Sequence, residues 1–152
     1  MDIMIKRVES AEQVAQLHAM TLAMAHVMGG EISLTMDELQ VMHQRNAFNG
    51  LIAYAGDKPV GYTVWSEGFH TYDGLFMYID DIFVDEAYRH QGIGKLLLST
   101  LINVATQNDY RNIEWLVETD NAELKRWYDS VGSAALAKYE YRRLPSAKYT
   151  GK

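Results

Sequence analysis

The chain has 152 residues, of which 48% are hydrophobic, a length that suits one domain with a buried core. Its formal net charge is −6 and its Lys and Arg residues are scattered, which argues against binding to a nucleic acid backbone. It has no cysteine, which excludes disulfides, thiolate metal sites and a cysteine acyl-enzyme. Because no apolar run approaches the roughly 18 residues of a membrane span, we expect one cytoplasmic domain over residues 1–152 that does not bind membranes.

The first third of the chain predicts a strand followed by two capped helices. Residues 4–8 suit a strand, and apolar residues at helical spacing predict a helix over 11–28. Ser10 is placed to cap this helix, and two glycines follow its last residue. A second helix is expected over about 36–45, with Thr35 as its cap.

Strands dominate the middle of the chain. Residues 51–55 and 60–65 read as two strands joined by the turn 56–59, whose Gly, Asp and Pro favour a hairpin. A loop rich in aromatic and acidic residues is expected over 65–74. Residues 76–84 are largely apolar, as in a central strand.

The rest of the chain predicts two more helices. Apolar residues recur at helical spacing over 92–106, and a strand is expected over 112–118. A helix over 122–130 and an extended region over 134–143 complete the pattern. This order of elements predicts an α/β sandwich with a mixed sheet.

A buried strand leads directly through a glycine-bearing turn into a helix. The first N–H groups of a helix have no intrahelical partner and lie at the positive end of its dipole, so they can hold a phosphate. Gly92 and Gly94 allow the backbone to approach such a group closely, and Arg89 adds a cation. This turn is not a nucleotide-binding P-loop, because that motif needs a glycine at position 89 and a Ser or Thr at position 96, where this chain has Arg89 and Leu96. An NTPase is therefore not expected.

The pattern Arg89-x-x-Gly92-x-Gly94 after an acidic, apolar strand resembles the acetyl-CoA signature of the GNAT acetyltransferase superfamily. The segment from Asn121 through Tyr128 to Gly132 is similar to a second block of that family. Within the superfamily, residues 61–81 resemble the spermidine/spermine and thialysine acetyltransferases.

The resemblance implies the GNAT fold, with a central mixed, twisted sheet of about six or seven strands flanked by about four helices. It also implies an N-acetyltransferase that uses acetyl-CoA as cosubstrate and forms a homodimer. With no cysteine available, transfer of the acetyl group must be direct or use another nucleophile, and we expect direct transfer without an acyl-enzyme.

Two sets of residues are implied to hold acetyl-CoA. The backbone of the strand end would bind the pantetheine arm and stabilise the oxyanion, while the turn would bind the pyrophosphate. Asn121 would either hold the cofactor arm or order the loop before the helix over 122–130, which it is also placed to cap, and Tyr128 would reach the sulfur of the cofactor. The strand and turn residues are Ile82, Phe83, Val84, Arg89, His90, Gln91, Gly92, Ile93, Gly94 and Lys95.

Acetyl transfer to an amine needs a base, because an alkyl ammonium has a pKa of about 10.4 and its free amine is scarce at neutral pH. We interpret Asp80 as that base, at the position where the polyamine-type relatives carry glutamate, with Asp81 as substrate ligand or electrostatic partner. Neighbours on a strand face opposite sides, so both reach one pocket only if a bulge interrupts the strand. Tyr128 is the candidate acid for the departing CoA thiolate.

The aromatic loop could clasp a cationic amine through Trp65, Glu67 and Tyr72, or serve as a dimer contact or hairpin cover. The five histidines show no metal-binding spacing, so no metal is expected, and His18 and His26 are interpreted as structural.

These patterns together predict an acetyl-CoA-dependent N-acetyltransferase acting on a small cationic amine such as a polyamine or thialysine. The acidic net charge would attract such a substrate. Two alternatives remain open: a peptide or protein N-acetyltransferase, and a non-catalytic CoA-binding module.

Overall fold

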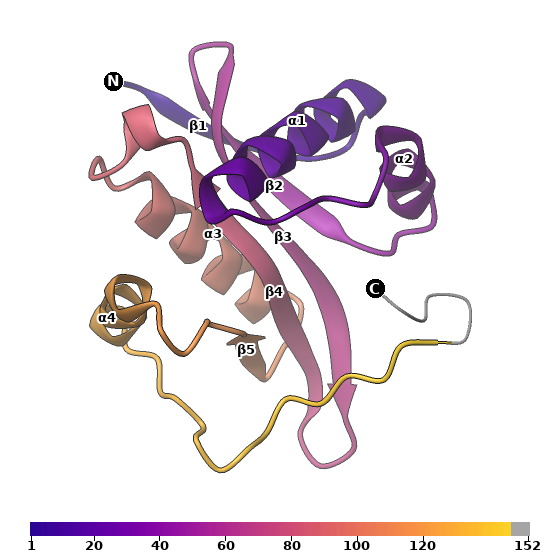
Figure 1. Cartoon of the computed structure of the whole chain (residues 1–152), viewed down its shortest axis with the longest axis vertical. Coiled ribbons are helices and arrows are strands. Elements are labelled where there is room, and N and C mark those ends of the chain that lie inside the picture. Colours follow the sequence, from indigo (N-terminus) through magenta and orange to yellow (C-terminus); the bar gives the residue numbers. More distant parts are fainter. Residues whose placement is uncertain (147–152) are drawn as a thin grey trace. The chain divides into compact units, whose positions relative to one another are not determined.

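A computed structural model describes residues 1–146, which form five strands, four α-helices and one 3-10 helix (Figure 1). The strands are β1 (Ile3–Arg7), β2 (Asn49–Ala55), β3 (Lys58–His70), β4 (Gly74–Val84) and β5 (Asn112–Trp115). The helices are α1 (Ala11–Met28), α2 (Met36–Gln44), the 3-10 helix η1 (Glu86–Tyr88), α3 (Ile93–Gln107) and α4 (Ala122–Ser130). The chain divides into two compact units, residues 1–116 and the part from residue 117 onward.

One mixed sheet organises the first unit. Its strands follow the order β1-β2-β3-β4-β5, and every neighbouring pair is antiparallel except β4 and β5, which are parallel. The parallel step requires a crossover, and α3 makes it between β4 and β5. The predicted α/β class with a mixed sheet is confirmed.

Local capping explains where the first two helices begin and end. Ser10 Oγ accepts the N–H of Gln13 at 3.2 Å, while the Gln13 side chain accepts the N–H of Ser10 at 3.1 Å, which completes a capping box. Thr35 and Glu38 form the same box at the start of α2. Gly29 ends α1 in the left-handed conformation, with φ 71°. The predicted caps and helix starts are confirmed.

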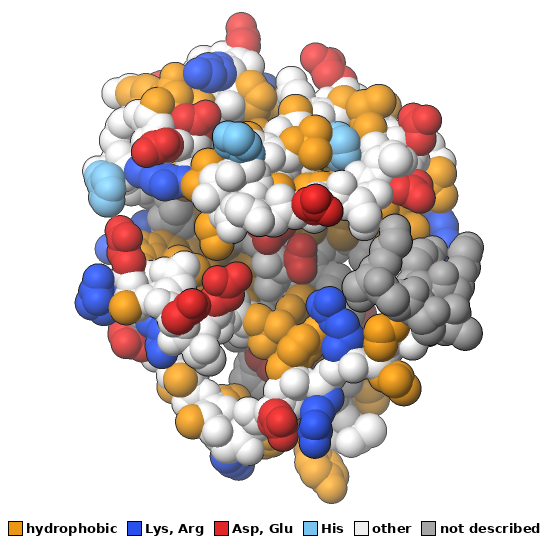
Figure 2. Space-filling view, viewed as in Figure 1, with side chains coloured by type: hydrophobic (Ala, Val, Ile, Leu, Met, Phe, Trp, Pro, Cys, Tyr) orange, Lys and Arg blue, Asp and Glu red, His pale blue; other side chains and the backbone are white. Residues whose placement is uncertain are grey.

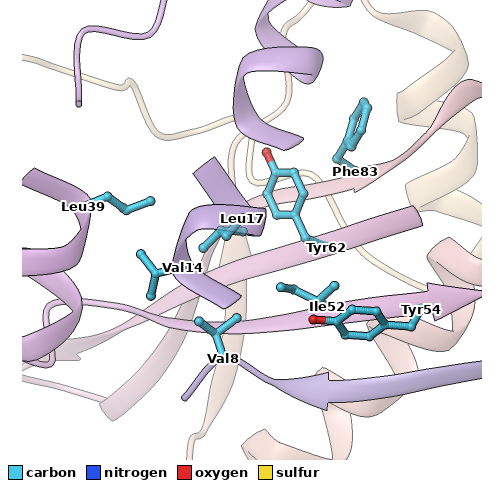
Figure 3. Close-up of a cluster of buried hydrophobic side chains, with 8 residues drawn as sticks. All are labelled: Val8, Val14, Leu17, Leu39, Ile52, Tyr54, Tyr62 and Phe83. Atoms are coloured by element: carbon cyan, nitrogen blue, oxygen red, sulfur yellow. The ribbon is translucent and has the colours of Figure 1, made fainter. Parts of the chain in front are cut away.

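The two faces of the sheet carry different helices. Side chains alternate along β2, so Ile52 and Tyr54 lie on one face, in a cluster with Leu17 of α1 and Leu39 of α2 (Figure 3). The other residues of this cluster are Val8, Val14, Tyr62 and Phe83. Helix α3 contacts β2, β3, β4 and β5 through its own apolar stripe, in which Leu97 and Leu101 are fully buried.

The middle of the chain is more regular than its sequence indicates. The predicted loop over 65–74 is wrong, because β3 continues to His70 and β4 begins at Gly74, with only residues 71–73 in the turn. Stacked rings of His70 and Phe76, with centroids 4.1 Å apart, hold the two arms of this long hairpin together. The first hairpin is also tighter than predicted, since Ala55 pairs with Lys58 across a two-residue turn.

The strand count is lower than the six or seven that the resemblance implies. β5 ends at Trp115 instead of Glu118, and residues 134–143 form no strand in the described chain. A strand needs a partner for its backbone groups, and no ladder pairs with that segment within residues 1–146. None of the helices in the same range is long and apolar enough to cross a membrane.

Candidate active site

One extra residue interrupts β4 at Asp80. Ile79 pairs with Trp65 and Asp81 pairs with Val64, so adjacent residues of β3 face residues of β4 that lie two apart. A bulge of this kind breaks the alternation of side chains along a strand. Asp80 and Asp81 line the same cavity. The bulge that the sequence requires for both acids to reach one pocket is therefore present.

This cavity, here called the acidic pocket, has a volume of about 310 Å³. β3 and β4 contribute Trp65, Ser66 and Tyr78 to its wall beside the two acids. Helix α1 and the chain between residues 32 and 48 supply the remainder, which is mainly apolar. Its apolar members there include Leu17, Ile32, Leu34, Leu39 and Phe48. The volume lies at the lower end of the range of ligand pockets, so the pocket suits a small molecule.

Asp81 is the more enclosed of the two acids, being half-buried where Asp80 is exposed. Burial disfavours its charged form and the nearby Asp80 carboxylate adds repulsion, which together raise the pKa of Asp81 to about 6. A hydrogen bond from the Tyr62 hydroxyl opposes this rise. A carboxylate with such a pKa is ionised at neutral pH and still basic enough to accept a proton from a bound substrate.

Two neighbouring residues of β3 fix the position of Asp81. The fully buried Tyr62 donates its hydroxyl to Asp81 Oδ2 at 3.3 Å, and Thr63 Oγ1 donates to the Asp81 carbonyl at 2.7 Å. Burial raises the pKa of Tyr62 far above its ordinary value, so its hydroxyl remains a donor. Sequence reasoning missed Tyr62; the only signal was a phenol in an apolar strand, which needs a buried partner for its hydroxyl.

The second half of β4 has a strand on one side only. β5 pairs with Phe76 to Ile79, whereas beyond Ile79 no strand of the described chain pairs with β4 opposite β3. Unpaired backbone groups on such an edge are open to a ligand, and Ile82, Phe83 and Val84 lie along it. Arg89 closes the end of the strand, because its Nε donates to the Val84 carbonyl at 3.0 Å.

A tight turn connects this edge to α3. His90 and Gly92 both adopt left-handed backbone, with φ 62° and 83°, and Gly92 caps α3 without a side-chain hydrogen bond. The N–H groups of Ile93, Gly94 and Lys95 belong to the first turn of the helix, where a bound anion is favoured. A Cβ at Gly92 would have open space, so this glycine is required by its backbone conformation and not by crowding.

The three residues expected from the aromatic segment are not brought together. Trp65 is buried in β3 and lines the acidic pocket. Glu67 lies further along β3 and accepts the Tyr110 hydroxyl at 2.8 Å, and Tyr72 is 99% exposed in the hairpin turn. Neither Glu67 nor Tyr72 lines the pocket.

His18, which is interpreted as structural from the sequence, lies beside this pocket. It lines the acidic pocket, and its Nε2 lies 3.0 Å from the Leu34 carbonyl, so it fastens the segment between α1 and α2. Among residues 1–146, no group of three His, Asp or Glu side chains is placed to hold a metal ion.

The second unit contains α4, with Asn121 and Tyr128. Asn121 Oδ1 accepts the N–H of Leu124 at 3.1 Å, so it caps the helix. Tyr128 is buried, and its ring lies edge-on to that of Trp127 with centroids 5.0 Å apart.

Residues 13–132 match the Acetyltransferase (GNAT) family, and this range covers well over half of the chain. The chain belongs to the GNAT acetyltransferase family. The matched range includes the β4 bulge, the turn before α3 and the α4 helix. The protein is therefore an acetyltransferase, as the motifs predict.

Curated relatives of this GNAT acetyltransferase act on amines. It is 26% identical to the thialysine N-epsilon-acetyltransferase of Caenorhabditis elegans over 133 residues, which cover 87% of this chain and 82% of that protein. It is 34% identical to the L-ornithine N5-acetyltransferase of Arabidopsis thaliana over 67 residues, or 44% of this chain and 29% of that protein. It is 27% identical to a tyramine N-feruloyltransferase of Nicotiana tabacum over 73 residues, or 48% of this chain and 32% of that protein.

Solved structures share its fold. An integron cassette protein from the mobile metagenome of V. cholerae superposes with a TM-score of 0.80 at 22% identity, covering 97% of this chain and 94% of that one. An aminoglycoside acetyltransferase from an uncultured soil metagenomic sample, in complex with sisomicin, gives a TM-score of 0.77 at 21% identity, covering 99% and 97%. These likenesses confirm the GNAT fold.

GNAT acetyltransferases use acetyl-CoA as cosubstrate, and the residues of this chain fit that molecule. The open edge of β4 has backbone groups that suit an amide-bearing arm, and the start of α3, where no side chain caps the first N–H groups, suits a pyrophosphate. Because the chain carries a net charge of −6, such local devices are needed to hold an anion.

Proposed function

We propose that this acetyltransferase transfers the acetyl group of acetyl-CoA directly to a primary amine of a small cationic molecule bound in the acidic pocket. The observation that carries the proposal is the β4 bulge, which places Asp80 and Asp81 together in one pocket. Two carboxylates there attract an ammonium group. The printed names of the relatives support it, since thialysine, L-ornithine and tyramine are all amines.

The cosubstrate would lie along the open edge of β4. Ile82, Phe83 and Val84 would offer backbone groups to its arm, and the turn from Arg89 to Lys95 would hold its pyrophosphate. Asn121 would order the loop before α4, a role that its capping bond supports.

We assign the two acids different roles in handling the substrate proton. The sequence predicts Asp80 as the base, but burial, which raises the pKa of Asp81 to about 6, favours Asp81 in this role. The hydrogen bond from Tyr62 holds the Asp81 carboxylate in position. Asp80, the exposed member, would hold the ammonium group. Asp81 would then take one of its protons, which leaves the nitrogen with the lone pair that attack requires.

The transfer balances with one acid and one base. The amine nitrogen forms a bond to the acetyl carbon, and the bond between that carbon and sulfur breaks. The departing thiolate takes a proton, for which Tyr128 is the candidate donor on the strength of the motif that it completes. The acylated nitrogen would release its remaining extra proton as the amide forms, and this proton would restore the Tyr128 hydroxyl.

Three sequence predictions beyond the reaction stay predictions: a homodimer, a cytoplasmic location and one domain over residues 1–152. The family match runs across the division at residue 116, which supports a single domain.

The proposed function is tested by the release of CoA from acetyl-CoA with a panel of amines and peptides, with each product confirmed by its mass. We expect a small amine to be acetylated at its amino nitrogen. Acetylation of peptides alone would replace this proposal with a protein N-acetyltransferase. Binding of acetyl-CoA without turnover on any acceptor would favour the CoA-binding module.

A further inference from the structure

The acidic pocket is charged on one part of its wall and apolar on the rest. Among its lining residues, Asp80 and Asp81 are the only carboxylates, and none is Lys or Arg. Ser66, Tyr78 and Thr21 add neutral polar groups, and His18, whose Nε2 lies 3.0 Å from the Leu34 carbonyl, adds an imidazole. The pocket can therefore hold one cationic group beside the two adjacent carboxylates, and the rest of its lining has no carboxylate to pair with a second one.

The chain between α1 and β2 provides most of the apolar part of this wall. It contributes Ile32, Leu34, Leu39, Ala47 and Phe48. Figure 2 shows that hydrophobic side chains also reach the surface over α1 and α2.

Acidic residues occur in this same segment but do not line the pocket. Glu31 and Asp37 are exposed, and Glu38 accepts the N–H of Thr35 at 2.8 Å to cap α2. The wall is therefore apolar even though the segment that forms it contains acidic residues. It selects against charge, because a second ammonium placed on it would lose its hydration without gaining a partner.

Charge and size together narrow the acceptor. A carboxylate on the substrate would lose hydration against the same wall and would be repelled by Asp80 and Asp81. An alkyl or aromatic group in that place would instead remove apolar surface from water. The volume of about 310 Å³ suits a body of modest size.

From this arrangement we infer that the preferred acceptor is a primary amine with a single positive charge and an apolar body, an alkylamine or an arylalkylamine, instead of a polyamine or an amino acid. The inference rests on the proposed function and makes its substrate class more specific. It departs from the polyamine and thialysine that the branch resemblance implies.

Matched substrates test this inference directly. Pentylamine and 1,5-diaminopentane have the same five carbon atoms and differ at one end, where pentylamine has a hydrogen atom in place of the second ammonium group. We expect kcat/KM for pentylamine and for 2-phenylethylamine to exceed that for 1,5-diaminopentane by about tenfold or more, after correction for its second amino group. For lysine and spermidine, kcat/KM should be as low as for the diamine.

The outcomes separate the inference from the function on which it rests. Equal or faster acetylation of the diamine would overturn the inference and leave the N-acetyltransferase intact. No acetylation of any amine would overturn the proposed function, and the inference with it.

A variant of the apolar wall gives a second test in the same protein. Leu34 is 37% exposed, so Leu34→Glu can add a carboxylate to this wall without burying it fully. We expect it to raise the ratio of kcat/KM for diaminopentane over pentylamine by about tenfold. Val27→Glu, on an exposed position of α1 outside the pocket, is the control and should leave this ratio unchanged.

Folding is checked separately, so that a failed variant does not decide the result. Both variants should melt cooperatively within a few degrees of the wild type, as expected for partly exposed sites. If Leu34→Glu is unstable, Ile32→Glu, at a position 36% exposed on the same wall, replaces it. A folded variant with the wild-type ratio would contradict the inference.

Discussion

The two halves of β4 differ in how the strand is held. From Phe76 to Ile79 it is paired on both sides, antiparallel to β3 and parallel to β5. From Asp80 to Val84 it has a bulge, two acids and β3 as its one partner in the described chain. The first half is bound into the sheet, and the second half offers side chains and backbone to ligands.

This difference is the basis of the roles proposed for the strand, with stability in one half and chemistry in the other. The paired half is anchored by the burial of Met77 and Ile79 in the sheet. The bulged half is oriented from β3 instead, through Tyr62 and Thr63. Substitutions in the second half should therefore change activity most, and those near the first half should change mainly stability.

The largest effect is expected from Asp81→Asn. Asparagine keeps the shape of the side chain but cannot accept the substrate proton, so kcat/KM should fall by about 10²-fold or more in a steady-state assay of CoA release. Asp73→Asn, in the exposed turn at the other end of β4, is the matched control and should retain full activity. A variant at Asp81 with near-wild-type kcat/KM would remove Asp81 as the base.

The same variant should be more stable than the wild type at neutral pH. The pKa of Asp81 is raised in the folded protein, so the folded state binds its proton more tightly than the unfolded state. Stability is therefore lost as the pH rises from about 4 through about 6, and Asp81→Asn avoids this loss. Urea unfolding at pH 8 should show a gain on the order of 1 kcal/mol.

A smaller loss of activity is expected from Tyr128→Phe, which lies outside the strand. Removing the hydroxyl should lower kcat by about 10-fold to 100-fold if Tyr128 protonates the departing thiolate. The affinity for acetyl-CoA, measured by calorimetry, should change little. Unaltered kcat would show that another group supplies this proton.

Gly61→Ala tests the connection between the halves from the side of β3. A Cβ at Gly61 would lie 2.8 Å from the Phe83 carbonyl oxygen, so β3 and β4 must move apart beside the open edge. We expect a loss of about 1–3 kcal/mol in the free energy of unfolding, together with weaker binding of acetyl-CoA. Gly30→Ala, where a Cβ meets nothing within 4 Å, should have neither effect.

The smallest effect is expected from His70→Ala, beside the first half of β4. His70 stacks on Phe76 and lies 2.9 Å from the Glu114 carboxylate on β5. Its removal should cost about 0.5–1 kcal/mol in thermal or urea unfolding and leave kcat/KM unchanged. A large loss of activity would contradict the division of roles along the strand.

Helix ends were predictable from sequence because caps act locally. The bounds of α1 and α4 match the predicted ranges, and Ser10, Thr35 and Asn121 cap as expected. Each cap satisfies N–H groups within three residues of itself, so a short window of sequence contains the necessary information.

The long β3–β4 hairpin was not predictable in this way. Its outer arms contain Gly68, His70 and other residues with weak strand preference, and the arms are held by contacts between partners distant in the chain. Phe76 covers Gly68 directly, and His70 reaches Glu114. The sequence of one arm does not reveal such cross-strand contacts.

The candidate site was predictable in its acids and its turn, but not in its walls. The pair at Asp80 and Asp81 and the glycines before α3 form continuous motifs, which a single sequence can show. The pocket wall combines α1, the segment before α2 and β3. Tyr62 and Leu34 lie near Asp81 only in the folded protein, and their positions in the sequence form no motif with Asp81 that could predict this.

The most direct test of the account is the pH dependence of kcat/KM for acetylation of one small amine by the wild type and by Asp81→Asn. If a cationic amine binds and Asp81 takes its proton, kcat/KM in the wild type should rise through a pKa of about 6 and then level. Tyr62→Phe should move this rise to higher pH. The Tyr62 hydrogen bond lowers the pKa of Asp81 in the wild type, so its removal raises that pKa. In Asp81→Asn the rise near pH 6 should disappear along with most of the activity. The same profile and rate in wild type and Asp81→Asn would contradict the account.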